Sequence, residues 1–98
     1  SNYLANMLID ARVHDSSKTA ILNIYPGDKL ENIEIICEEL DLNLTFATKG
    51  ELTPHQGIDI ILDEGAFGWV PSLYILAHNP LELVDRMHQI VSLIHSRA

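Results

Sequence analysis

Residues 58–68 read IDIILDEGAFG, an apolar run that ends on two acidic residues and continues into a glycine-flanked loop. The run from Ile58 to Leu62 is rich in β-branched and aliphatic residues and is bounded by turn residues, a pattern typical of a buried strand. Asp63 and Glu64 would stand at the carboxyl end of this strand, where open α/β sheets expose their ligand-binding loops. The stretch therefore predicts a central strand with a candidate acidic site at its end.

The segments on either side of this strand predict further strands and helices. Strands are expected at 19-TAILNIY-25, 43-NLTFAT-48 and 69-WVPSLYIL-76. The first is apolar on both faces, which favours a central position. The last becomes regular near Ser72, because Pro71 has no N–H to donate, and is expected at the edge of the sheet. Helices are expected over 3–12, 30–40 and 81–95, where apolar residues recur at helical spacing. Asp28 and Pro80 are suited to begin the last two.

This order of elements predicts an α/β fold with about four mostly parallel strands, two main helices and a short N-terminal helix. A parallel crossover needs roughly a dozen residues or more, and several connections here are shorter. The expected architecture is therefore a trimmed flavodoxin-like sandwich. We expect one domain over 1–98, in which residues 1–17 form a helix and linker from a preceding module and residues 18–98 form the core.

The composition narrows the classes of function. The chain has 98 residues, of which 47% are hydrophobic, and a formal net charge of −8. An acidic surface repels phosphates, so a nucleic-acid partner is not expected. The apolar runs are too short to cross a membrane, and no membrane contact by this segment is expected. The single cysteine, Cys37, has apolar helical neighbours and fits a buried residue in a reducing, cytoplasmic compartment, including a cytoplasmic domain of a membrane-anchored protein.

Several of these segments resemble the receiver domains of phosphorelay proteins. The stretches that carry the resemblance, from Lys18 onward, are AILNIY, NLTFATKGE, DIILD and LYILAHNPLELVDRMHQIVSLI. In receivers, strands of the first two kinds lead to a third that ends on the phosphoacceptor, and a final strand leads into an amphipathic helix. The resemblance implies a receiver-like core over 18–98, with Asp63 at the position of the phosphoacceptor.

The chain also departs from the receiver pattern. Receivers bind Mg²⁺ through an acidic pair after the first strand, because this hard cation needs carboxylate oxygens. Here Tyr25-Pro26-Gly27 replaces that pair and leaves only Asp28 nearby, while Asn79 stands in place of the family's lysine. The strand that carries the switch Ser or Thr is absent. These departures imply a degenerate receiver, or pseudo-receiver, with no metal and no cofactor.

A closer resemblance is to the alpha/beta/loop domain of Rcs-type phosphorelay sensor proteins. It is carried by the acidic step at 63–64, by Trp69-Val70-Pro71-Ser72 and by Pro80-Leu81-Glu82-Leu83. This likeness implies a linker or docking module, without chemistry of its own, in a hybrid histidine kinase or a related phosphotransfer protein. Its partners would be other domains of the same signalling protein or a phosphorelay partner protein.

Three functions are therefore open. The first is a non-catalytic, receiver-like interaction or linker module of a bacterial hybrid sensor kinase or phosphorelay protein. The second is a divergent true receiver that is phosphorylated on Asp63. The third is a small, unrelated α/β protein-binding domain, with a homodimer packed through the first or last helix as one form. No enzyme activity is expected.

The residues that follow Asp63 form the candidate contact surface. Phe67, Trp69, Val70 and Pro71 place two aromatic rings in an irregular, glycine-rich loop. A Trp in such a loop either fills the edge of a core or anchors a partner. Both alternatives stand at this point, and core filling is favoured because a trimmed sheet leaves one end in need of a cover.

The histidines offer weaker candidates. His55 lies near Asp59 and Asp63 in sequence, but no cluster of His and Cys supports a metal site. His88 and His95 are seven residues apart on the last helix and are expected to be solvated or part of a contact surface. Asn79-Pro80 resembles the Lys-Pro step that is often cis in receivers, and the sequence leaves its isomer open.

Overall fold

The computed structural model describes residues 2–48, 51–52 and 57–97. Within them the helices and strands are α1 Asn2–His14, β1 Ala20–Ile24, α2 Glu31–Glu39, β2 Leu44–Thr48, β3 Glu51–Leu52, β4 Ile60–Asp63, β5 Ser72–Ala77 and α3 Pro80–Ser96. None of the described helices is long and apolar enough to span a bilayer. The predicted α/β class and its short N-terminal helix are confirmed.

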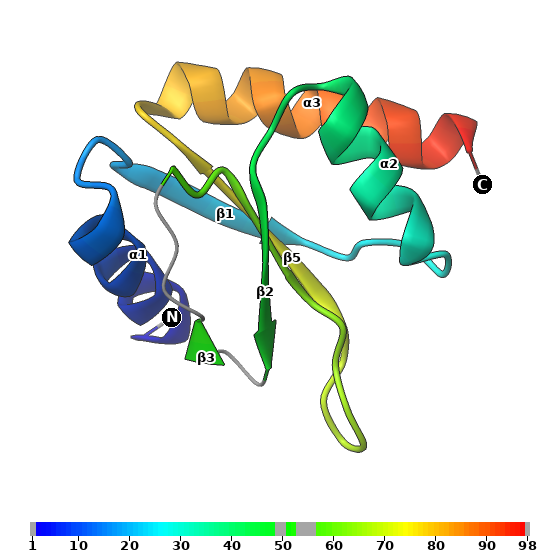
Figure 1. Ribbon diagram of the computed structural model, residues 1–98, viewed down its shortest axis with the longest axis horizontal. Coiled ribbons are helices and arrows are strands. Elements are labelled where there is room, and N and C mark those ends of the chain that lie inside the picture. Colours follow the sequence, from blue (N-terminus) through cyan, green and yellow to red (C-terminus); the bar gives the residue numbers. More distant parts are fainter. Residues whose placement is uncertain (1, 49–50, 53–56, 98) are drawn as a thin grey trace.

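The strands form one sheet in the order β1-β5-β4-β2-β3 (Figure 1). Among the described strands only β2 and β4 are parallel neighbours, and every other adjacent pair is antiparallel. The prediction of a mostly parallel, flavodoxin-like sheet is therefore wrong. For β4 and β5 the physical reason is the connection over residues 64–71, which is too short for a helical crossover, so β5 returns antiparallel to β4.

Two strands occupy positions other than those expected. β1 lies at one edge of the sheet rather than at its centre, and β5 lies between β1 and β4 rather than at the edge. β1 is apolar on both sides because α1 and α3 both contact it. Its apolar residues therefore indicate that helices cover both of its faces, and they do not indicate a central position in the sheet. β5 begins at Ser72, as predicted, and Pro71 stands just outside the ladder.

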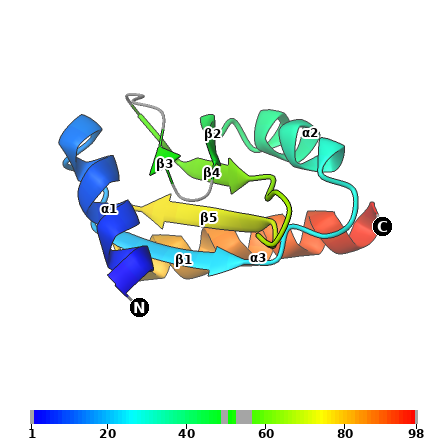
Figure 2. The same cartoon turned by 90° about the horizontal axis from the view of Figure 1, so that it is seen from below.

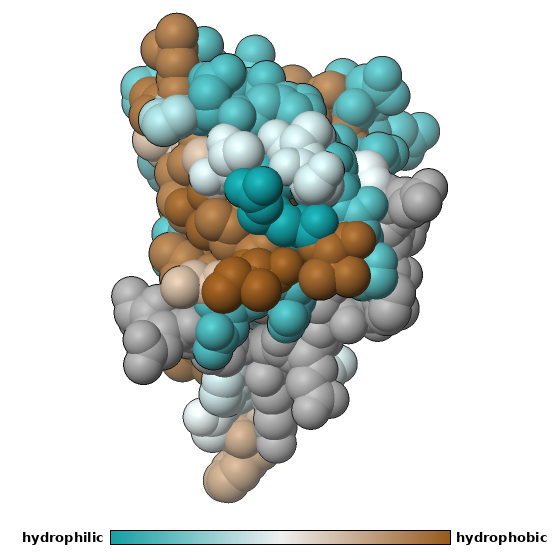
Figure 3. All heavy atoms as spheres, turned by 90° about the vertical axis from the view of Figure 1, so that its left-hand side faces the viewer, coloured by the Kyte–Doolittle hydropathy of each residue, from teal (hydrophilic) through white to brown (hydrophobic). Residues whose placement is uncertain are grey.

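α1 covers one face of the sheet, on the side opposite to α2 and α3 (Figure 2). The buried residues at this contact are Met7, Ala11, Ala47, Ile58, Ile61, Tyr74 and Leu76. Ile9 and Val13 point outward and are largely exposed. Figure 3 shows the α1 side of the molecule, where apolar residues form a band across the surface.

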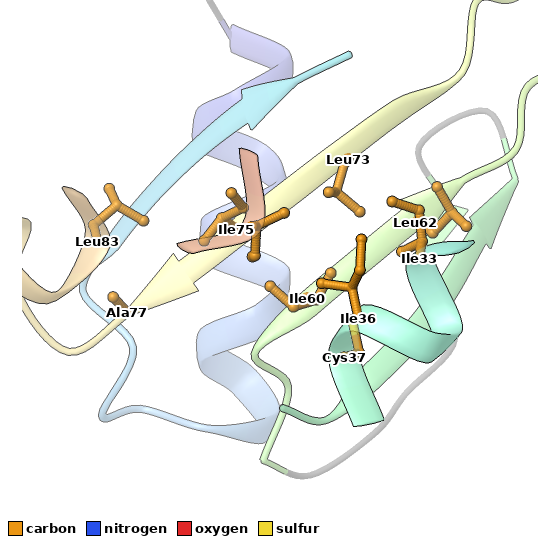
Figure 4. Close-up of a cluster of buried hydrophobic side chains, with 10 residues drawn as sticks. Ile33, Ile36, Cys37, Ile60, Leu62, Leu73, Ile75, Ala77 and Leu83 are labelled. Atoms are coloured by element: carbon orange, nitrogen blue, oxygen red, sulfur yellow. The ribbon is translucent and has the colours of Figure 1, made fainter. Parts of the chain in front are cut away.

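The other face of the sheet carries the larger core, under α2 and α3. Figure 4 shows how side chains of the two helices meet those of β4 and β5: Ile33, Ile36, Cys37, Leu83, Ile60, Leu62, Leu73, Ile75 and Ala77. Burying one Ile or Leu side chain contributes roughly 1.5–3 kcal/mol. This face therefore supplies most of the apolar stabilisation, and the α1 face supplies less.

The two main helices begin differently. Pro80 occupies the first turn of α3, as predicted. The N-cap is Asn79, which was not predicted as a cap, and its Oδ1 accepts the Glu82 N–H at 2.8 Å. α2 has Leu30 at its N-cap and no side-chain cap, so the expected role of Asp28 is wrong. Asp28 instead accepts the Tyr25 hydroxyl at 2.7 Å. No cis peptide bond occurs among the described residues, so Asn79-Pro80 is trans.

Cys37 is buried in the larger core, as predicted. Burial, followed by the negative charges of Asp59 and Glu34, raises its pKa from 9.0 to about 11. Because only the thiolate reacts, a rise of this size alone lowers the reactive fraction near neutral pH by about 100-fold. We expect Cys37 to react with iodoacetamide at least that much more slowly in the native protein than in concentrated guanidinium chloride. Equal rates in the two states would contradict this burial.

Candidate functional site

Asp63 ends β4 and organises the loop that follows it. Its side chain is 1% exposed. Oδ1 accepts the backbone N–H of Gly65 at 2.9 Å, and Oδ2 accepts the indole N–H of Trp69 at 3.1 Å. Hydrogen bonds to a carboxylate are among the stronger ones in proteins. Asp63 therefore ties both ends of the loop to the end of the strand.

The tip of the loop is a tight turn between Ala66 and Trp69. Their backbone groups exchange two hydrogen bonds, of 3.0 and 2.8 Å. Gly65 and Gly68 adopt positive φ angles, of +79° and +76°, which glycine accepts at little energetic expense. A Cβ on Gly65 would lie 2.5 Å from the carbonyl oxygen of Trp69. The loop is thus built for one backbone conformation.

The loop projects from the body of the protein (Figure 1). The side chains that it exposes near its tip are apolar. Phe67, at the turn, is fully exposed, and Val70 is 72% exposed. Trp69 and Pro71 are half-buried. Of the two roles considered for this segment, Trp69 fills the edge of the structure over Asp63, whereas Phe67 and Val70 are left available for contact.

A shallow groove lies beside the loop, against the end of β1. Its volume is about 420 Å³, and its lining consists of Asn23, Ile24, Tyr25, Trp69, Val70, Pro71, Ser72 and Tyr74. Three aromatic rings stand among these residues, and no Lys or Arg does. Asn23 donates to the Ser72 hydroxyl at 3.4 Å. The hydrogen bond to Asp28 raises the pKa of the Tyr25 hydroxyl, which stays neutral near pH 7.

The geometry around Asp63 suits a structural role better than phosphoryl transfer. An acceptor must offer a carboxylate oxygen to the donor, and both oxygens of Asp63 are buried and engaged. Phosphoryl transfer also depends on cations that neutralise the transferred group. Within the described parts of the chain, no group of three or more His, Cys, Asp or Glu side chains could hold a metal ion.

The histidines do not join this site. His55 lies outside the described residues. His88 and His95 are exposed on α3, two helical turns apart. α3 covers the face of the sheet opposite to α1, while alternation along β4 places Asp63 on the same face as Ile61, which packs on the α1 side.

A second polar cluster joins three separate segments, and sequence reasoning missed it. Lys18, whose side chain is 3% exposed, lies 2.7 Å from Asp15 and 3.2 Å from Asp59. Arg86 of α3 lies 3.5 Å from the same Asp59 and 3.3 Å from Glu82. Backbone and side-chain hydrogen bonds from His78, then the Arg86 charge, lower the pKa of Glu82. Every one of these cations has a carboxylate partner, so the cluster is a structural clasp.

Asp15 makes this clasp sensitive to pH. Its hydrogen bonds with Lys18 and Ser17 lower its pKa from 3.8 to about 2. The stabilisation is therefore complete above pH 3.8 and is lost as the pH falls towards 2. We expect Asp15→Asn to flatten the fall in unfolding free energy over this range, measured by urea denaturation. Asp10→Asn, an exposed change of the same kind on α1, is expected to leave the slope as it is.

Comparison with known proteins identifies the fold. No protein-family model matches the chain, and no curated protein matches its sequence significantly. The whole chain superposes on the C-terminal domain of protein MJ0236, with a TM-score of 0.77 and 18% identity. In addition, 92% of it superposes on the C-terminal domain of phosphomethylpyrimidine kinase, with a TM-score of 0.76 and 19% identity. The chain spans 61% of the length of each of these neighbours.

These neighbours correct the resemblance to receivers. They are not receiver domains, so the identification with a pseudo-receiver or an alpha/beta/loop domain, and the placement in two-component phosphorelay signalling and hybrid histidine kinases, are wrong. The motifs were short apolar strands, which many α/β sheets share, and the antiparallel β4–β5 pair has no place in a wound parallel sheet. At this level of identity the likeness shows the fold alone. The chain is thus similar in fold to the C-terminal domain of protein MJ0236 and to a C-terminal domain found in a kinase polypeptide.

Proposed function

We propose that this chain is a non-catalytic binding domain that contacts another protein domain through the loop between β4 and β5. The observation that carries the proposal is the placement of Phe67. It is fully exposed at the tip of a loop whose backbone is held by Asp63 and by the Ala66–Trp69 turn. A large apolar ring held out in water from an ordered loop has no role in the fold of this chain.

The chemistry of the loop fits a protein interface. Residues 65–71 read GAFGWVP and carry no charge. Interface cores are depleted in charged residues and enriched in aromatic ones, and a few such anchors supply most of the binding energy. Because the loop is already ordered, little conformational entropy is lost on association. The adjacent groove, with Tyr25 and Tyr74 in its lining, extends the aromatic surface.

The partner that we favour is another domain of the same polypeptide, with a separate protein as the alternative. Both structural neighbours are C-terminal domains, and each is longer than this chain. The proposal includes a cytoplasmic location, in which the reduced Cys37 is stable. It assigns no reaction to the chain, because Asp63 is engaged in the loop and the thiol of Cys37 is buried.

A small-molecule-binding domain is a second candidate, favoured by the groove of about 420 Å³, a size within the range of ligand pockets. The kinase neighbour suggests phosphomethylpyrimidine as the probe. The groove lining lacks Lys and Arg, so a phosphate would stand uncompensated beside Asp28. We therefore expect no change in melting temperature or in Trp69 fluorescence with this compound. A saturable change abolished by Tyr74→Phe would favour the second candidate.

Photo-crosslinking tests the first proposal. The full polypeptide is to be produced in its own cells with p-benzoylphenylalanine at position 67, and in parallel at position 13 on α1. We expect a discrete adduct from position 67, within the polypeptide or to one partner, because an interface anchor lies against its partner. Val13 is also exposed and apolar, and it reports the α1 surface. An adduct from position 13 alone, or none from position 67, would count against the loop.

A further inference from the structure

A second groove lies between α2 and the parallel pair of β2 and β4, away from the exposed tip at Phe67. We call it the α2 groove, and its lining consists of Leu30, Glu31, Glu34, Phe46, Leu62 and Glu64. Phe46 forms the apolar floor and pairs in the parallel register with Leu62, which is itself buried in the larger core. Phe46 is 41% exposed, although its neighbours Thr45 and Ala47 on the same strand are buried. The floor therefore offers apolar surface that the fold leaves uncovered.

The rim of this groove is acidic on two sides. Glu31 and Glu34 come from the first turns of α2, and Glu64 follows β4. Within the described parts of the chain, none of these three carboxylates forms an ion pair. Glu31 and Glu34 are spaced i,i+3 on α2, so their like charges are neighbours on the helix surface. Among the residues that the structure describes, no cation pairs with this rim, so negative charge gathers around an apolar floor.

We propose that the α2 groove receives a segment of a partner protein in which one large apolar side chain is flanked by Lys or Arg. The apolar side chain lies on the exposed ring of Phe46, and the cations pair with the carboxylates of the rim. This groove is a separate surface from the tip of the β4–β5 loop proposed above as a contact. The proposal for the tip does not say what kind of partner binds, whereas the groove specifies a partner segment that is basic with one large apolar side chain.

Size and charge select this occupant. The groove has a volume of about 270 Å³, below the range of roughly 300–1,000 Å³ that encloses a whole small-molecule ligand. It fits one side chain of a longer segment. The chain has 14 Asp and Glu against 6 Lys and Arg. Of those cations, Lys18, Arg86 and Arg97 already pair with carboxylates. A nucleic acid or an anionic membrane would be repelled, whereas a basic segment is attracted and steered to the rim.

Peptide titration followed by NMR tests this inference. The probe is an acetylated and amidated pentapeptide, Arg-Lys-Phe-Lys-Arg, added to the ¹⁵N-labelled protein. We expect saturable shifts centred on the backbone amides of 30, 31, 34, 46, 62 and 64. The peptide Arg-Lys-Ser-Lys-Arg has the same charge, and we expect it to bind at least tenfold more weakly, because it leaves the floor uncovered.

Paired variants separate the groove from general attraction to an acidic protein. Glu31→Gln with Glu34→Gln is expected to weaken binding of the Phe peptide by about tenfold, since two rim ion pairs are lost. Asp10→Asn with Asp85→Asn changes the net charge equally at exposed sites on α1 and α3, and it is expected to change affinity by less than about twofold. Phe46→Ser is expected to weaken binding, whereas Val84→Ser, at 42% exposure on α3, is not.

The peptide titrations and the variants can each contradict the proposed groove. Shifts centred elsewhere, equal affinity for the Phe and Ser peptides, or an equal loss in the two double variants would each overturn the inference. Phe67→Ser serves to distinguish it from the proposal for the loop. If that variant keeps full peptide affinity, the groove stands whatever the crosslinking at position 67 shows, and a loss of affinity would mean that the peptide reports the loop instead.

Discussion

Asp63→Asn is expected to lower the free energy of unfolding by about 2 kcal/mol. The two oxygens of Asp63 accept N–H groups from Gly65 and Trp69. An asparagine in either orientation turns its own NH₂ group towards one of these donors and leaves that donor without its acceptor. Losing a hydrogen bond to a charged acceptor in a buried site is worth roughly 1.5–3 kcal/mol. Urea denaturation followed by circular dichroism measures the change.

Trp69 provides an internal reporter for the same variant, because it is the only tryptophan of the chain. In either orientation of the new amide the contact of the loop with residue 63 is weakened, and we expect the Trp69 emission to shift to the red in the native state. Asp85→Asn replaces an exposed carboxylate on α3 and is expected to change the stability by less than about 0.5 kcal/mol. If Asp63→Asn matched the wild type in stability and in emission, the carboxylate would not be what holds the loop.

Gly65→Ala is expected to be the most destabilising single change in the loop, at about 3 kcal/mol. Two effects add: the positive φ of +79° strains any residue with a Cβ, and that Cβ would lie 2.5 Å from the Trp69 carbonyl oxygen and 3.0 Å from the Pro71 nitrogen. Such backbone strain and overpacking each amount to roughly 1–3 kcal/mol. Thermal and urea unfolding measure the loss.

Gly68→Ala is the matched control for this change. Gly68 has nearly the same φ, +76°, but a Cβ there would meet nothing within 4 Å. It therefore carries the strain without the clash, and we expect a loss of about 1–2 kcal/mol. The difference between the two losses in unfolding free energy measures the effect of the close approach between Gly65 and the segment Trp69–Pro71. Equal losses of unfolding free energy would show that Gly65 is not packed against Trp69 and Pro71 as described.

Local elements were predictable where one physical cause dominates. The stripe of apolar residues in 81–95, with Pro80 before it, predicted α3, because both the fixed φ of proline and the packing favour a helix there. Pro71 located the start of β5 at Ser72, since a residue without an N–H cannot extend the ladder. The buried positions of Ile60, Ile61 and Leu62 likewise followed from an uninterrupted apolar run.

Strand order and direction were not predictable in the same way. β1 is apolar on both sides, a pattern shared by a central strand and by an edge strand that two helices cover. The choice between these depends on how α1 and α3 pack, which is set by contacts remote in sequence. The length of the 64–71 connection did carry the relevant constraint. It excluded a helical crossover, and an antiparallel return was the remaining solution.

The candidate site was found in sequence by residue type, but its internal organisation was not. Asp63, Phe67, Trp69, Val70 and Pro71 all belong to one loop, as their proximity in sequence suggests. The hydrogen bond from the Trp69 indole to Asp63 depends on the turn at Gly65, because this turn brings the indole back over the end of β4. The glycines at 65 and 68 were the signal for that turn. Nothing in the local sequence pairs Lys18 with Asp59, 41 positions away, because that contact arises from the sheet.

The affinity of the crosslinked partner for loop variants tests the central claim most directly. With that partner purified, the dissociation constant is to be measured for the wild type, Phe67→Ser and Val13→Ser. Both changes remove an exposed apolar side chain and are expected to alter stability by less than about 0.5 kcal/mol. We predict that Phe67→Ser weakens binding by tenfold or more, as loss of an aromatic anchor does, and that Val13→Ser changes it by less than about twofold. Equal affinity of Phe67→Ser and the wild type would contradict the assignment of the β4–β5 loop as the contact surface.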